Sequence, residues 1–238
     1  MNPKFLACLA AVAALAVPSA SAAPEVPNDG RLTNYLVVAE DLSDFSGGVQ
    51  GFVAERNVRR HGFDSKMDAQ RLNGYLGYDL TRWLTFYGLA GIQSAKDKRA
   101  GIQSETVFAY GAGLWARLID DDQLDFLQTF SRYRLNAGAE ISHSDPNDLS
   151  WTQFDAFLTF GLVNDLFLTD DIFPTSITVS FGPVYSAVEM DGFKQVPDNR
   201  FGFSVGLDMT FAQGVYAGLG YDFFNDDNVA HFSAGVRF

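Results

Sequence analysis

The chain has 238 residues, of which 47% are hydrophobic and 14% aromatic, and its formal net charge is −12. This acidic balance argues against nucleic acid as a partner, because nucleic-acid binding requires a basic surface. The single cysteine excludes a disulfide framework and a cysteine-rich zinc site. The many apolar and aromatic residues exclude a disordered chain, and the length suits one domain or two.

The N-terminal segment has the composition of an export signal. Lys4 precedes an apolar run of 13 residues (5–17), and a small-residue A-x-A pattern follows at 20–22. The run is shorter than the about 20 residues that a membrane-spanning helix requires. We therefore predict a cleaved secretory signal peptide over residues 1–22, whose removal takes the only cysteine, Cys8, from the mature chain.

After residue 46 the dominant pattern is alternation with a period of two. In residues 200–211 every second residue is large and apolar, and the residues between are small, polar or charged. Successive side chains of a β-strand point to opposite faces, so such a segment has one apolar and one polar face. The usual length of these alternating segments suits a strand that crosses a membrane at a tilt. Ten segments share the pattern: residues 48–58, 70–80, 83–93, 104–118, 126–141, 151–163, 175–188, 200–211, 214–224 and 228–238.

The charges in these segments favour a barrel with its apolar face outside. In seven of the ten segments the charged residues lie in the polar row, and none of them is lysine. A soluble β-protein, the alternative, would have an outer face rich in lysine and glutamate. We predict an all-β fold over residues 47–238: a transmembrane antiparallel up-and-down β-barrel of about 10 strands, with 8 or 12 as alternatives. Polar side chains are expected to fill its lumen, with these charges: Arg71, Asp79, Glu105, Arg132, Arg134, Glu140, Asp155, Arg200, Asp208, Asp222 and Arg237.

Two places are irregular. Glu55 and Arg56 are adjacent, so both can face a polar lumen only if the strand contains a bulge. Pro183 lies inside the segment 175–188, where it removes one hydrogen-bond donor from the ladder.

The end of the chain resembles a known family. Residues 229–238 alternate and finish on Phe238, as does the closing strand of small bacterial outer-membrane β-barrel proteins with 8 to 12 strands. The resemblance implies residence in the outer membrane of a Gram-negative bacterium, contact with its lipids and lipopolysaccharide, and periplasmic termini. Residues 23–46 are then an N-terminal periplasmic segment, in which 32–45 is either a helix or an extra short strand. The resemblance also implies that the outer-membrane assembly machinery reads Phe232, Ala234, Val236 and Phe238.

The same topology assigns outer loops near residues 59–69, 94–103, 142–150, 189–199 and 225–227. All lysines of the mature chain fall in these loops. One hypothesis is that they bind lipopolysaccharide phosphates through charge-assisted hydrogen bonds, and the alternative is that they are solvated loop lysines. The lysines are Lys66, Lys96, Lys98 and Lys194.

The leading functional interpretation is an integral outer-membrane barrel with a structural or surface-interaction role. Ten strands enclose little space, and balanced lumen charges favour internal ion pairs, so the lumen is expected to be largely closed. A narrow, porin-like pore for small solutes is the first alternative, and an outer-membrane hydrolase is the second.

The hydrolase alternative rests on further resemblances. Outer-membrane proteases pair Asp/Asp with His/Asp at the outer rim, where His61, His143, His231 and the pair Asp226-Asp227 are expected here. His231-x-Ser233 resembles the His-x-Ser of lipid A deacylases, although here both residues lie in the polar row. An enzyme is not expected, and neither is a cofactor or a metal site. The run 120–122 lacks the glycine-centred spacing of a calcium loop.

Overall fold

The computed structural model describes ten ranges of the chain, nearly all of them strand: residues 45–60, 63–81, 83–97, 106–121, 132–145, 150–166, 174–190, 193–195, 199–211 and 215–237. The strands are β1 (Phe45–Arg60), β2 (Phe63–Thr81), β3 (Leu84–Asp97), β4 (Val107–Asp121), β5 (Arg132–Ser144), β6 (Trp151–Asp165), β7 (Pro174–Met190), β8 (Phe193–Gln195), β9 (Phe201–Phe211), β10 (Val215–Phe224) and β11 (Asn228–Arg237). No helix in these ranges is both long enough and apolar enough to span a membrane.

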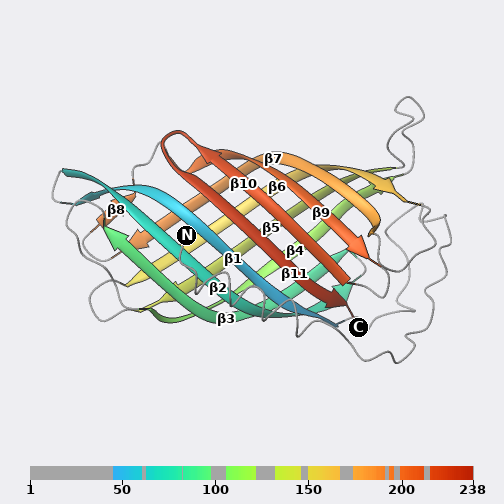
Figure 1. The fold of residues 1–238 in the computed structure, drawn as a ribbon, viewed down its shortest axis with the longest axis horizontal. Helices are drawn as coiled ribbons and strands as arrows, with labels where there is room; N and C mark the ends of the chain where they lie inside the picture. Colours follow the sequence, from blue (N-terminus) through green and yellow to red (C-terminus); the bar gives the residue numbers. More distant parts are fainter. Residues whose placement is uncertain are drawn as a thin grey trace.

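Ten of these strands form a closed antiparallel barrel (Figure 1). The sheet runs from β11 through β10, β9, β7 and then down to β1, and β1 pairs with β11 from Ser46↔Arg237 to Glu55↔Asn228. Closure leaves no exposed sheet edge along the barrel wall. The predicted ten-stranded up-and-down barrel is thereby confirmed. The barrel begins at Phe45, and the predicted signal peptide and residues 23–44 lie outside the described residues.

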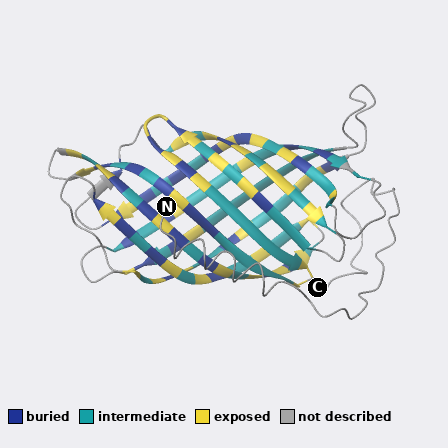
Figure 2. Cartoon of the chain, viewed as in Figure 1, coloured by how far each residue is buried: buried dark blue, intermediate teal, exposed yellow. Residues whose placement is uncertain are grey.

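The period-two pattern becomes an inside and an outside face. In β7, Thr178, Val184 and Ser186 are buried, whereas Val179 and Phe181 are exposed. Figure 2 shows the same alternation of buried and exposed residues along the other strands. In a closed sheet one face of each strand must point to the interior. Once the barrel is closed, the alternation therefore determines whether each side chain points inward or outward.

Several strands extend further than predicted. β2 already begins at Phe63 and β3 continues to Asp97, so much of the expected loops 59–69 and 94–103 is strand. Alternation continues there, but the apolar side chains now face the interior and the charged ones face outward. Met67 and Ala69 are buried, while Lys66 is exposed. Because the prediction placed every apolar row outside, it ended these strands too early. The predicted loops 142–150 and 189–199 likewise contain strand residues, including all of β8.

No bulge is needed at Glu55 and Arg56, because only Arg56 faces the interior. The β1–β2 register runs unbroken through Glu55↔Asp68 and Arg56↔Met67, with Arg56 buried and Glu55 on the outer face. Pro183 does interrupt pairing, because the β6–β7 ladder passes from Phe157↔Val184 directly to Phe160↔Phe181. The missing N–H of proline accounts for this gap.

Candidate functional site

The two ends of the barrel differ in strand length. The end that holds Phe45 and Arg237 is named the termini end, and the opposite end, where β8 lies, is named the β8 end (Figure 1). β9, β10 and β11 have 11, 10 and 10 residues, whereas β1, β2 and β7 have 16, 19 and 17. The three short strands therefore stop before the β8 end, and the wall needs another element there.

β8 supplies that element. It pairs with β7 through Glu189↔Lys194 and with β1 through Arg59↔Lys194, antiparallel in both cases. β8 therefore lies between β7 and β1, in the place that β9, β10 and β11 occupy nearer the termini end. The wall remains continuous, and its circumference is reduced at this end.

Side chains satisfy the backbone groups that the short strands leave unpaired. The Gln195 amide accepts a hydrogen bond from Val188 N (2.9 Å) and donates one to Ser186 O (3.2 Å). On the other side, Asp227 Oδ1 accepts from Asn57 N (2.6 Å) and from Asn199 Nδ2 (2.9 Å). Unpaired backbone groups in a buried place are costly, so these side chains complete the ladders of β7 and β1. We name β8 together with Gln195, Asn199 and Asp227 the β8 seal.

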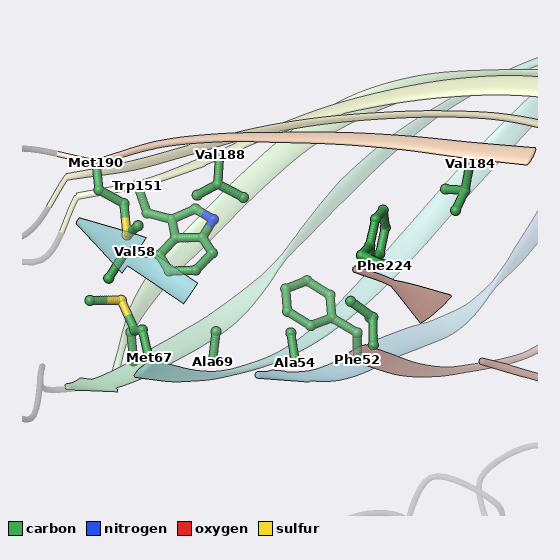
Figure 3. Packing of buried hydrophobic residues seen from close by; sticks show 12 residues of the cluster. Phe52, Ala54, Val58, Met67, Ala69, Trp151, Val184, Val188, Met190 and Phe224 are labelled. Atoms are coloured by element: carbon green, nitrogen blue, oxygen red, sulfur yellow. The ribbon is translucent and has the colours of Figure 1, made fainter. Parts of the chain in front are cut away.

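Beneath the β8 seal, apolar side chains from facing walls meet in the interior (Figure 3). Trp151 of β6 and Met190 of β7 lie toward Val58 of β1 and Met67 of β2, and all four are at most 4% exposed. A lumen filled only with polar side chains, as predicted, is therefore wrong at this end. At this end the interior excludes water by apolar packing, as in a soluble protein. The cluster comprises Phe52, Ala54, Val58, Met67, Ala69, Ala95, Trp151, Val184, Val188, Met190, Phe224 and Val229.

A buried charged layer adjoins this cluster. Arg56 donates to Ser186 Oγ (2.7 Å), and its Nη1 lies 3.9 Å from Asp227 Oδ2. Ser186 in turn donates to Asp155 (2.5 Å). The guanidinium of Arg56 also lies 4.8 Å from the ring centre of Phe224, a cation–π contact. Burial raises the pKa of Asp227, against the opposing effects of the Asn57 hydrogen bond and the Arg56 charge.

A second charged layer crosses the middle of the interior. Arg71 of β2 forms an ion pair with Glu140 of β5, although these strands are not neighbours in the sheet. Gln50 donates to the same carboxylate (2.8 Å), and so does Tyr87 (3.1 Å). The Arg71 guanidinium lies 4.6 Å from the ring centre of Phe52. This layer therefore joins β1, β2, β3 and β5 across the lumen.

Toward the termini end the interior charges are less buried. Asp120 pairs with Arg134 (3.1 Å) and Arg117 (3.6 Å), and Asp79 pairs with Arg237. Side-chain exposure is 4% for Arg71, 18% for Arg134 and 42% for Arg237. Solvent therefore reaches interior side chains on this side of the closure. His231, whose Nε2 lies 3.2 Å from Asp222, is closer to the β8 end, because it pairs with Phe52 of β1.

The predicted lumen charges have three placements. Interior contacts are made by Arg71, Asp79, Arg134, Glu140, Asp155, Asp222 and Arg237. Asp208 lies beside Gly218 of β10, and Arg200 precedes β9 with its carbonyl accepting from Ser186 N. Glu105 and the side chain of Arg132 lie outside the described residues.

The structure also gives interior contacts to residues outside the predicted set of lumen charges: Arg56, Gln195, Asn199 and Asp227. A polarity change along β1 signals Arg56, but no local pattern signals the other three, because their partners are distant in sequence.

The hydrolase candidates are not brought together. His143 lies on the outer face, with Nδ1 2.9 Å from Thr152 Oγ1 and its ring 5.5 Å from that of Tyr110. His231 lies inside beside Asp222, and Asp227 is committed to the β8 seal. His61 lies outside the described residues. In the described ranges no group of three or more His, Cys, Asp or Glu is placed to hold a metal ion.

The lysine candidates that the structure describes lie on β2, β3 and β8. Lys66 is half-exposed and its Nζ lies 2.7 Å from Glu55 Oε1. Lys96 is exposed on β3 opposite Asp68, and Lys194 lies in β8. Lys98 lies outside the described residues.

The outer face defines the class of protein. Between its two ends this face is covered by exposed apolar side chains, such as Leu219, Phe203 and Leu76. Aromatic rings follow one another across β5, β6, β7 and β9, with the Phe160 and Phe181 centroids 5.5 Å apart. A closed sheet satisfies its backbone internally, and an apolar band around it suits lipid. The chain is a membrane-spanning β-barrel of the bacterial outer-membrane type.

No family model and no curated protein matches the chain. Among solved structures it is similar to the transport unit of the autotransporter AIDA-I from Escherichia coli (9% identity, 100% of this chain and 98% of that chain, TM-score 0.45). It is also similar to an outer membrane channel from Pseudomonas putida F1 (14%, 84% and 97%, TM-score 0.44) and to the outer membrane protease OmpT from Escherichia coli (11%, 86% and 99%, TM-score 0.40). At these identities the likeness concerns the fold alone.

Proposed function

We propose that the protein is a closed outer-membrane barrel with a structural or surface-interaction role, and that its β8 end faces outside the cell. The observation that supports closure is the stack of three barriers across one end: the β8 seal, the apolar cluster, and the charged layers of Arg56 and Arg71. The ion pair of Arg71 and Glu140 is linked to Gln50 and Tyr87 from two further strands, so it braces the wall as well as filling the lumen.

The outward faces support this orientation. At the β8 end the outer face of β1 and β2 carries the exposed ion pairs Arg59–Asp64 and Lys66–Glu55, which belong in water. These strands therefore project beyond the apolar band. Phe45 and Arg237, the first and last described residues, lie at the opposite end, which is periplasmic in the family that the closing strand resembles.

Conductance across planar bilayers tests the closure. We expect the refolded wild-type barrel to show no steady ion current, and its heat-modifiable mobility on cold SDS gels to report correct folding. A variant with Trp151→Gly and Met67→Gly removes two large members of the apolar cluster and is expected to raise ion leakage. A steady single-channel current from the wild type would contradict the proposal.

A narrow pore remains the second candidate, because one observation favours it. Interior side chains near the termini end, such as Arg237, retain solvent exposure, so this part of the lumen is accessible to water. The same bilayer measurement distinguishes the two roles, since a narrow pore conducts steadily without any substitution.

The hydrolase role has less support than either. His143 and His231 lie on opposite faces of the wall, so they do not form one catalytic group. We expect the refolded barrel to cleave neither peptides nor lipid A. A peptide-cleaving or lipid A-cleaving activity that the wild type shows and His231→Ala lacks would support the hydrolase role.

Lipopolysaccharide is the partner that we propose for the outer face of the β8 end. Lys66 and Lys96 are exposed there, and lysine binds phosphate through charge-assisted hydrogen bonds. Glu55 competes for Lys66, so the contribution of this lysine is expected to be small. Unchanged lipopolysaccharide retention after neutralising Lys66, Lys96, Lys98 and Lys194 would contradict the proposal.

Export and assembly complete the proposed role. We propose that residues 1–22 are removed on export and that the assembly machinery reads the last strand. Phe232, Ala234 and Val236 form the outward row of β11, where Phe232 lies against Gly51 of β1. Phe238 lies outside the described residues. N-terminal sequencing of the mature protein tests the cleavage, and outer-membrane yield of a Phe238→Ala variant tests the recognition.

A further inference from the structure

β8 is held in the wall by much less backbone pairing than the barrel strands are. It has two register pairs with β1 and two with β7. In contrast, β1 and β11 pair along the whole of β11, from Asn228 to Arg237. The attachment of β8 therefore depends strongly on side chains, above all on the two hydrogen bonds that join Gln195 to the backbone of Val188 and Ser186.

A polar layer lies directly beneath β8. Within the described part of the chain four of its buried atoms make no hydrogen bond to protein: Arg56 Nε and Nη1, Asn199 Oδ1 and Asp227 Oδ2. Arg56 Nη1 and Asp227 Oδ2 form an ion pair at 3.9 Å, longer than a hydrogen bond. These atoms keep the capacity to bind water, so displacement of β8 would expose a hydrophilic surface.

Removing β8 would leave one defined opening. β9 is paired with β7 only as far as Tyr185↔Phe201, and β11 with β1 only as far as Glu55↔Asn228. Beyond those points the backbone ladders that join β7 to β1 are those of β8. Single hydrogen bonds, from Ser186 N to Arg200 O and from Asn199 and Asn57 to Asp227, form the lower border of this place. The opening would lie between β7 and β1, above the β10–β11 turn, and would lead past Arg56, Ser186 and Asp227 instead of through the apolar cluster.

We propose that β8 is a displaceable strap that leaves its place between β1 and β7, while the ten barrel strands stay paired, and so admits water and small ions to the interior. This inference goes beyond the closed barrel proposed above, because it makes the closure reversible. The charged lining of the opening, with both a guanidinium and carboxylates, suits hydrated ions better than apolar solutes.

A cysteine lock tests the strap in planar bilayers. The full chain with Cys8→Ser gives a mature barrel without cysteine. Arg59→Cys and Lys194→Cys then place two thiols on paired positions of β1 and β8. The matched control is Leu219→Cys with Phe232→Cys, on paired positions of β10 and β11 away from β8. Gln195→Ala, introduced separately and also into both pairs, loosens the strap.

We expect Gln195→Ala to raise the frequency of brief openings about tenfold, the change that corresponds to losing one or two hydrogen bonds. Oxidising the β1–β8 pair should abolish the openings, reduction should restore them, and oxidising the control pair should change nothing. Openings that persist in the oxidised β1–β8 pair, or a folded Gln195→Ala barrel without openings, would overturn the strap.

The lock also separates this inference from the proposed function. A wild-type barrel that conducts steadily contradicts the closed barrel, and that current then either disappears on locking, which supports the strap, or persists, which overturns it. If Gln195→Ala does not refold, Asn199→Ala takes its place in the same measurements, because it removes the hydrogen bond to Asp227 in the β8 seal.

Discussion

Arg71 and Glu140 form a buried ion pair across the interior of the barrel, from strands that are not neighbours in the sheet. Their side chains are 4% and 12% exposed, and the carboxylate also accepts hydrogen bonds from Gln50 and Tyr87. Removing one partner of a buried pair leaves the other charge without compensation. The pair is therefore a sensitive point for the stability of the whole wall.

Arg71→Met is expected to lower the free energy of unfolding by about 3–5 kcal/mol, because it leaves Glu140 buried and unpaired. The double variant Arg71→Met with Glu140→Gln should lose less than the two single variants added together. Urea titration in lipid vesicles measures both. The control is Arg59→Met, which breaks a half-exposed ion pair and should produce no measurable change. Equal effects at Arg71 and Arg59 would contradict the buried role.

Two glycines in neighbouring strands test interior packing, Gly113 beside the interior side chain of Tyr87 and Gly88 on the outer face as the control. A Cβ at Gly113 of β4 would collide with the ring of Tyr87, whereas a Cβ at Gly88 of β3 would meet nothing within 4 Å. We expect Gly113→Ala to displace Tyr87, weaken its hydrogen bond to Glu140 and lower folding yield. Gly88→Ala should be neutral or slightly stabilising, because alanine loses less backbone entropy in a strand. Heat-modifiable mobility after refolding compares them, and equal yields would refute the packing argument.

The apolar band predicts where a charge is not tolerated. Leu219 lies on the outer face of β10 and is 61% exposed, a position that lipid covers in the membrane. Leu219→Arg is expected to destabilise the barrel by about 2–4 kcal/mol if it lies near the middle of the bilayer. Asn228→Arg, on an exposed residue where β11 begins, should have little effect. Unfolding of both variants from lipid vesicles provides the comparison, and a tolerated Leu219→Arg would place this face outside lipid.

Asp227 gives the stability of the β8 seal a pH dependence. Burial raises its pKa, so the ionised carboxylate opposes folding. Below the ordinary aspartate pKa of about 3.9 the group is protonated in both states and the penalty is absent. The penalty grows as pH rises through the raised pKa. Asp227→Asn keeps an oxygen acceptor for Asn57, so its stability relative to wild type should increase with pH.

Asp226→Asn, an exposed neighbour in the same turn, is the control and should give no such slope. Unfolding titrations from about pH 4 to pH 8 measure both differences. A flat difference for Asp227→Asn would mean that its carboxylate is compensated by Arg56 and its hydrogen bonds.

The sequence by itself predicted about ten barrel strands, with 8 or 12 as alternatives, and determined their antiparallel order and the apolar outer row over most of each strand. These follow from local alternation, because the period of a strand is fixed by its backbone and needs no distant partner. Residues 200–211 illustrate this, since their alternating side chains take the outward and inward positions of β9.

Only the tertiary structure decided which face is inside at the β8 end. Alternation in β2 is the same around Met67 and around Leu76, yet Met67 is buried in the lumen and Leu76 faces outward. The pattern gives two faces, but their direction depends on whether lipid or water lies outside. Arg56, Ser186 and Asp227 come from β1, β7 and the β10–β11 turn, so their meeting depends on closure of the barrel and leaves no trace in local sequence.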